Sequence, residues 1–437
     1  SGYRSPALCS AIGSSVDSQH AKGMAADFEI YGTPNNEIFN WIKHNLMYDQ
    51  MILEMLAADE VSPEDPEALR ATGFLARNWY KFDRNVWLDD TVEHTAKAFL
   101  GITLNCCRCH DHKYDPISQK EYYGFRAIFE PYDVRTDRIP GELDVEKDGL
   151  PRVHDAKPDA KTFFFERGDP KRARSDESLD PSVPSVVKGL SFEAEEVLLP
   201  VLAYYPALKE HVIEDLRDKR KNDLLAAEKE YSGARVAFLK AKFGIVRKDE
   251  SAGGSGAEKG KREEESEDET SPAEKSSTRE DSKVRKKLAR AKQQLARKRL
   301  LARKVHLEET NARIAAEKHK HGFADHADGK ESNATIAYGH LSSVAATLQR
   351  SFKVASAVEK LSDEECKLKQ VSLRPDKDAE KAKKAVEAAT KKVESARTAL
   401  EQARKHLDDN GTDYEPIGPI HPSSSTGRRL SLAQWIA

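Results

Sequence analysis

The chain has 437 residues, of which 33% are charged and only 38% belong to the hydrophobic set. Apolar side chains are too few for the whole chain to bury one core, so part of it must be solvated helix or disorder. The net charge of −3 excludes a polyacidic protein and gives no support for nucleic-acid binding. No run of about 18 apolar residues occurs, so we predict no transmembrane helix.

The segments in chain order predict a mainly α-helical protein. We expect a small α/β fragment over residues 1–54 and a helical domain over residues 55–135. In that domain a helix over residues 88–104 is predicted to run directly into a group of cysteines. Residues 136–205 are rich in proline, glycine and aspartate, so we expect a loop-rich extension with a few short strands.

Long antiparallel coiled-coil helices are predicted over residues 206–408. The clearest signal is a stripe from Ala379 to Leu407, in which alanine, valine and leucine recur every three or four residues. Such a stripe needs a partner helix to cover it. Its small alanines favour close packing within one chain, and dimerisation stays open as an alternative. Residues 248–282 contain almost no apolar side chain, so we expect disorder there.

The cysteines carry the most specific chemical signal. Three of the five cysteines are clustered, whereas a disulfide framework would spread them along the chain. Cys106 and Cys109 form, with His110, the C-x-x-C-H pattern of c-type haem attachment. Thiols at this spacing add to the two vinyl groups of haem, and the adjacent histidine ligates the iron. We therefore predict covalently bound haem c held by these three residues.

Other interpretations fit the same residues. A C-x-x-C pair also occurs in redox dithiols, although a thioredoxin-like context is missing here. Cys107 with His110 or His112 would complete a cramped zinc site, and inert thiols are a further alternative. The sixth haem ligand is not identified. His94 on the preceding helix is a candidate, but a surface position explains this histidine better, and five-coordinate iron stays open.

The stretches around the motif resemble the planctomycete cytochrome-c-like (PSCyt-type) domain family. They are residues 71–75, 87–104 and 106–123. The resemblance extends over roughly residues 45–205 and implies a haem c module in a large secreted or periplasmic protein of undetermined function. It also implies a second domain after variable, often coiled-coil insertions. Residues 424–437 resemble the beginning of that domain, so we expect residues 409–437 to be a linker and its truncated start.

A second signal lies near the N-terminus, where small residues separate His20 from Asp27. An imidazole and a carboxylate at this spacing can share one zinc ion, and Arg4 is a candidate for binding a substrate carboxylate. The pattern resembles the zinc D-Ala-D-Ala carboxypeptidase and endolysin family, which implies that His20 and Asp27 are zinc ligands. The third ligand and the general base of that family are missing, so we expect an incomplete site without peptidase activity.

We favour the haem interpretation: a c-type module for electron transfer or another redox role, with an unknown redox partner, within a larger secreted protein. Covalent attachment implies maturation outside the cytoplasm, so we expect a periplasmic or secreted location. A zinc-dependent peptidoglycan hydrolase and a structural coiled-coil protein with inert cysteines are the alternatives. Because residues 1–54 and 55–437 resemble different families, we also expect a chimeric chain.

Overall fold

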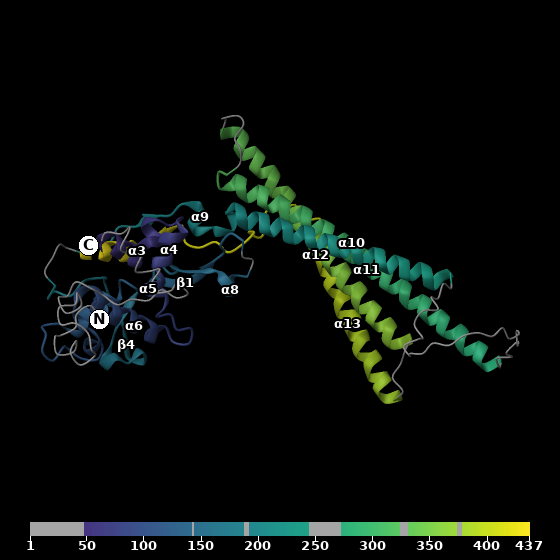
Figure 1. Cartoon of the computed structure of the whole chain (residues 1–437), viewed down its shortest axis with the longest axis horizontal. Helices are drawn as coiled ribbons and strands as arrows, with labels where there is room; N and C mark the ends of the chain where they lie inside the picture. The colour runs from purple at the N-terminus through teal and green to yellow at the C-terminus, as the bar shows by residue number, and fades with distance from the viewer. Residues whose placement is uncertain (1–47, 142–143, 188–191, 244–271, 324–330, 374–377) are drawn as a thin grey trace, which may run out of the picture. The chain divides into compact units, whose positions relative to one another are not determined.

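A computed structural model describes residues 48–141, 144–187, 192–243, 272–323, 331–373 and 378–437. Helices dominate this part of the chain, which confirms the predicted mainly α-helical class (Figure 1). The chain divides into two units. The first holds the described residues up to Val212 together with Gly418–Ala437, and the second is Ile213–Ile417. Among the described helices, none is long and apolar enough to cross a membrane.

Long helices make up most of the second unit. They are α10 (Glu210–Phe243), α11 (Pro272–Lys320), α12 (Glu331–Leu373) and α13 (Ala379–Lys405). α12 packs against both α11 and α13 (Figure 1). The buried face of α13 includes Val393, Ala396 and Leu400, so part of the predicted apolar stripe is covered within the chain. α11 begins at Pro272, so the last part of the segment predicted to be disordered, residues 272–282, is helical.

Helices of the first unit begin at polar caps that the sequence supplies. Asp65 caps α4, Asp83 caps α6, and Ser118 forms a capping box with Glu121 at the start of α7. These side-chain oxygens accept hydrogen bonds from backbone N–H groups that have no partner within the helix. The helices of this unit are α3 (Tyr48–Val61), α4 (Pro66–Ala71), α5 (Gly73–Ala76), α6 (Arg84–Thr95), α7 (Gln119–Arg126), α8 (Val145–Asp148), α9 (Val201–Tyr204) and α14 (Arg428–Ile436).

Antiparallel strand pairs connect these helices. β1 (Tyr132–Asp137) pairs with β2 (Leu150–Asp155), β3 (Thr162–Phe165) with β4 (Ala173–Leu179), and β5 (Val197–Leu198) with β6 (Ser424–Ser425). Short 3-10 turns follow, namely η3 (Glu166–Gly168), η4 (Pro170–Arg172) and η5 (Pro206–Leu208). The β5–β6 pair joins segments that lie far apart in the sequence, so it brings the C-terminal segment back to the first unit.

The C-terminal helix α14 completes the core of the first unit. Leu432 and Ala433 are fully buried in a cluster that also contains Leu56 of α3 and Leu75 of α5. α14 packs directly against α3 (Figure 1). The residues that resemble the start of a further domain therefore lie, in this structure, in the same unit as the cysteine motif.

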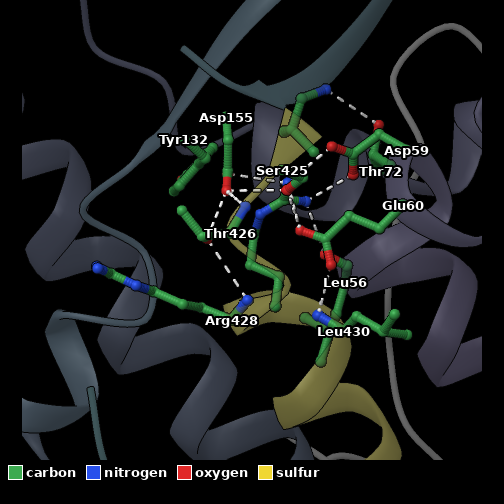
Figure 2. Close-up of polar contacts among 12 residues, drawn as sticks. Leu56, Asp59, Glu60, Thr72, Tyr132, Asp155, Ser425, Thr426, Arg428 and Leu430 are labelled. Atoms are coloured by element: carbon green, nitrogen blue, oxygen red, sulfur yellow. Dashed lines mark hydrogen bonds and ion pairs between the residues drawn. The ribbon is translucent and has the colours of Figure 1, made fainter. Parts of the chain in front are cut away.

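A buried ion cluster fastens α14 to α3 and β2 (Figure 2). Arg429 is 1% exposed, and its two Nη atoms donate to the Oδ atoms of Asp59 at 2.6 and 2.7 Å. Nη2 also lies 3.1 Å from Asp155 Oδ1 and 3.1 Å from Glu60 Oε1. One guanidinium thus meets three acidic side chains away from water, where charge-assisted hydrogen bonds are strong.

Ser425 lies between two of these carboxyl groups (Figure 2). Its Oγ lies 2.6 Å from Glu60 Oε1 and 2.9 Å from Asp155 Oδ2, but a hydroxyl has only one hydrogen to donate. Burial raises the pKa of Glu60 to about 8. Burial also acts on Asp155, but Arg429 and hydrogen bonds from Thr426 hold the pKa of Asp155 below its ordinary value. The raised pKa makes Glu60 the carboxyl group of this cluster that holds a proton at neutral pH.

Replacing Arg429 by methionine should destabilise the first unit by about 3–5 kcal/mol, because Asp59 and Asp155 are then buried without their counter-charge. Urea unfolding followed by tryptophan fluorescence measures this loss, since Trp87 is 2% exposed within the core of the same unit.

The matched control is Arg70→Met, which removes an exposed ion pair. Arg70 and Glu67 have side chains that are 44% and 72% exposed, and such surface pairs contribute about 0–1 kcal/mol. Equal losses of stability in the two variants would contradict the anchoring role of the buried cluster.

The proton on Glu60 should make the stability of the first unit fall as the pH rises. An unfolded chain releases this proton near the ordinary pKa of 4.5, whereas the folded protein retains it up to about 8. Between these values the folded state binds more protons, so the free energy of unfolding decreases with rising pH and levels off above pH 8. The Glu60→Gln variant should lose this decrease of the free energy of unfolding with rising pH. The Glu67→Gln variant, changed at an exposed position, should keep the pH dependence of the wild type. Identical slopes in all three proteins would rule the assignment out.

Candidate functional site

The cysteine motif lies on a short turn that follows a helix break. α6 passes into a π-helix, η1 (Ala96–Leu100), which stops at Gly101. Gly101 has a φ of +67°, a left-handed conformation that glycine adopts without steric cost and that commonly ends helices. The 3-10 helix η2 (Asn105–Arg108) then carries the first cysteines. The continuous helix predicted over residues 88–104 is therefore wrong after Leu100.

The structure separates the three clustered cysteines into two kinds. Cys106 and Cys109 are exposed, whereas Cys107 is fully buried. The Cys107 thiol donates to the carbonyl oxygen of Ile117 at 3.7 Å. Loss of solvent raises the pKa of Cys107 to about 11, so this thiol stays protonated and unreactive at neutral pH. The two exposed thiols are those of the C-x-x-C-H pattern.

A hydrogen bond to the backbone orients the ring of His110. Its side chain is exposed, and its Nδ1 lies 2.7 Å from the backbone carbonyl oxygen of Asp111. A carbonyl oxygen only accepts hydrogen bonds, so Nδ1 carries the proton and donates it. Nε2 is therefore the nitrogen with the lone pair, and this combination is typical of histidines that ligate metals.

His112 has the opposite hydrogen-bond pattern. Its side chain is 10% exposed, and its Nδ1 accepts from the backbone N–H of Asp115 at 2.8 Å. Its own backbone N–H donates to the carbonyl oxygen of Ile117 at 2.9 Å, so His112 closes the turn after the motif. Within the ranges that the structure describes, no three His, Cys, Asp or Glu side chains form a group that could hold a metal ion.

Helix α7 holds the motif through the backbone of Arg108. The carbonyl oxygen of Arg108 accepts from Gln119 Nε2 at 2.8 Å and from the Tyr123 hydroxyl at 3.1 Å. The same Gln119 nitrogen lies 2.9 Å from the carbonyl oxygen of Phe165 at the end of β3. Gln119 and Tyr123 are four residues apart and share one face of α7. That spacing on a helix just after the motif is the sequence signal that points to them.

Asp89 of α6 fixes the side chain of Arg108. Arg108 Nη1 donates to Asp89 Oδ2 at 2.8 Å, and the Tyr122 hydroxyl donates to Asp89 Oδ1 at 2.6 Å. The buried Arg126 reaches the same Oδ1 at 3.2 Å. Since Arg108 stands directly before Cys109, this network holds the turn that presents the exposed thiols.

The remaining residues singled out from the sequence are His94 and three residues near the N-terminus. Arg4, His20 and Asp27 are outside the described residues, so their roles stay predictions. His94 is exposed in the last turn of α6, which fits a surface histidine, and the sixth ligand stays unassigned.

Comparison with known families gives matches for both resemblances. A family model described as PSCyt2, protein of unknown function (DUF1549), matches residues 35–134, and a Peptidase M15 model matches residues 1–57. The first match contains the cysteine motif and α7, and the second contains His20 and Asp27. The β3–β4 hairpin lies outside both matches. No curated protein and no solved structure matches the chain.

Thiol labelling of the protein without bound cofactor should distinguish the two exposed cysteines of the motif from the buried one. Cys106 and Cys109 should react with a maleimide in the folded protein because they are exposed. Cys107 should react only after unfolding, since it is buried and its pKa is raised to about 11. Tandem mass spectrometry assigns each label, and the buried Cys366 serves as an internal control. Rapid labelling of Cys107 in the native protein is the result that contradicts its placement.

Proposed function

We propose that the first unit carries covalently bound haem c through Cys106, Cys109 and His110. The observation that supports this most is the arrangement of the motif. Its two thiols are exposed, its histidine keeps Nε2 for a ligand, and the third cysteine, Cys107, is withdrawn into the core. This donor set fits haem c, which takes two thioether bonds and an axial imidazole.

Each residue of the turn has a separate task in this proposal. Haem, when bound, supplies two vinyl groups and a redox-active iron. Cys106 and Cys109 present the thiols that add to the vinyl groups. His110 presents Nε2 as the axial ligand, while the hydrogen bond from Nδ1 to Asp111 fixes the orientation of the ring.

The packing around the turn supports selective attachment. Cys107 is buried and its pKa is raised, so it does not compete with its neighbours, because thiols react through their thiolate form. The bonds from Gln119 and Tyr123 to the Arg108 carbonyl hold the backbone between the reactive thiols. A site held in this way keeps its geometry before the cofactor arrives.

The role that we propose is electron transfer, or another redox role within a larger secreted protein. An iron held by a covalently attached porphyrin suits a one-electron carrier. Haem c is attached outside the cytoplasm, so a periplasmic or secreted location is part of the same proposal.

A zinc-dependent peptidoglycan D,D-carboxypeptidase or endolysin is the second candidate. The Peptidase M15 match over residues 1–57 favours it. His20 and Asp27 would bind zinc, and Arg4 would bind a substrate carboxylate. The third ligand and general base of that family are missing from the sequence, so this candidate ranks below haem binding. A structural coiled-coil protein with inert cysteines ranks third, because it gives no role to the exposed thiols of Cys106 and Cys109.

Expression with haem c maturation machinery should give a protein whose Soret band survives acid–acetone extraction. The double variant Cys106→Ala with Cys109→Ala should lose this band, because both thioether bonds are removed. Cys107→Ala is the matched control, and it should keep the band and the mass increase of one haem.

A colourless wild-type protein would overturn the proposal, as would a covalent band that persists in the double variant. A colourless protein that binds one equivalent of zinc, with the zinc lost in His20→Ala, would favour the peptidase candidate.

A further inference from the structure

The turn after β3 has an unusual backbone beside the cysteine motif. Arg167 has φ 54° and ψ 27°, and Gly168 has φ +72°, so two successive residues are left-handed. Arg167 is the one non-glycine residue with positive φ in the part of the chain that the structure describes. A left-handed residue with a side chain costs roughly 1–2 kcal/mol, and such strain persists where surrounding contacts hold it, often at functional sites.

Gly168 lies directly against the second cysteine of the motif. A Cβ atom on Gly168 would be 2.7 Å from Cys109 Sγ, 3.2 Å from the carbonyl oxygen of Arg108 and 3.3 Å from Arg108 Nε. The first distance is too short for a non-bonded contact, so the sulfur would have to move. The Arg108 carbonyl has little freedom to adjust, because it already accepts hydrogen bonds from Gln119 and Tyr123.

The β3–β4 hairpin is tied to the motif by the same residues. Gln119 Nε2 donates to the carbonyl oxygens of both Arg108 and Phe165. The Phe165 ring packs edge-on against Tyr123 at 5.2 Å between centroids. Contacts from α7 therefore fix the position of the Arg167–Gly168 turn relative to Cys109. The hairpin itself lies outside residues 35–134, which match the PSCyt2 family model.

We propose that the Arg167–Gly168 turn is a positioning element that sets the direction of the Cys109 thiol, and that formation of the second thioether bond depends on Gly168. This inference rests on the proposed haem function. In that step the Cys109 sulfur bonds to one vinyl carbon and a hydrogen ends on the other, so no oxidant is consumed. Gly168 acts through Cys109 and touches no cofactor itself.

The experiment compares Gly168→Ala with Gly141→Ala. Gly141 is also left-handed, with φ +84°, but a Cβ there meets nothing within 4 Å. The control therefore carries the same backbone strain without the contact to sulfur. Gly168→Asn is the second test variant, because asparagine tolerates the left-handed region while still adding the Cβ.

The first readout needs no haem. Maleimide labelling of Cys109, measured against Cys106 in the same molecule, should change by about two- to tenfold in both Gly168 variants, because a side chain forced out of its preferred rotamer costs about 0.5–1.5 kcal/mol. Gly141→Ala should match the wild type. Tryptophan fluorescence of the buried Trp87 verifies that each variant is folded.

The second readout uses protein loaded by the maturation machinery. Both Gly168 variants should yield haem attached through Cys106 alone, seen as a pyridine haemochrome band displaced toward that of a haem with one free vinyl group. Unchanged labelling of Cys109 in folded Gly168→Asn overturns the positioning role. If the wild type takes up no haem but the labelling difference is present, the proposed function fails and the positioning role at the thiol stands.

Discussion

Arg429 is the residue on which the first unit depends. Its guanidinium contacts acidic side chains from two separate segments, Asp59 and Glu60 at the end of α3 and Asp155 at the end of β2. Removing charges from water is costly, and mutual attraction offsets the cost only where geometry and hydrogen bonds are good. The cluster joins α14 to α3 and β2 beside the core that contains Leu432.

The cysteine turn is shaped by a different constraint, namely where helices stop and start. Gly101 ends the helix before the motif, and Ser118 starts the helix after it. Between these two points the 3-10 helix η2 carries the motif, with Cys107 turned inward while Cys106 and Cys109 are exposed. Polar contacts from α7 to the Arg108 carbonyl then hold this arrangement.

Local signals made part of this structure predictable. The alanine-rich stripe of α13 and the C-x-x-C-H motif are patterns within short windows, so they can be read without knowing the fold. The partners of Arg429 cannot be read in this way, because Asp59 lies 370 residues earlier in the chain. The approach of Gly168 to Cys109 is equally hidden, since it depends on the packing of a hairpin and not on any spacing near the motif. Gly101 is a helix-stop signal in the sequence, but a single glycine does not by itself end a predicted helix, and its left-handed backbone is seen only in the structure.

The return of the C-terminal segment to the first unit has a consequence for synthesis of the chain. Asp59, Glu60 and Asp155 leave the ribosome long before Arg429 does. At about 5–20 residues per second, residues 213–417 alone take on the order of ten to forty seconds to translate. During this interval α3 lacks both its counter-charge and its covering helix, while α11 and α12 can already pair because their contacts are local. During this time the nascent first unit is open to chaperones and proteases.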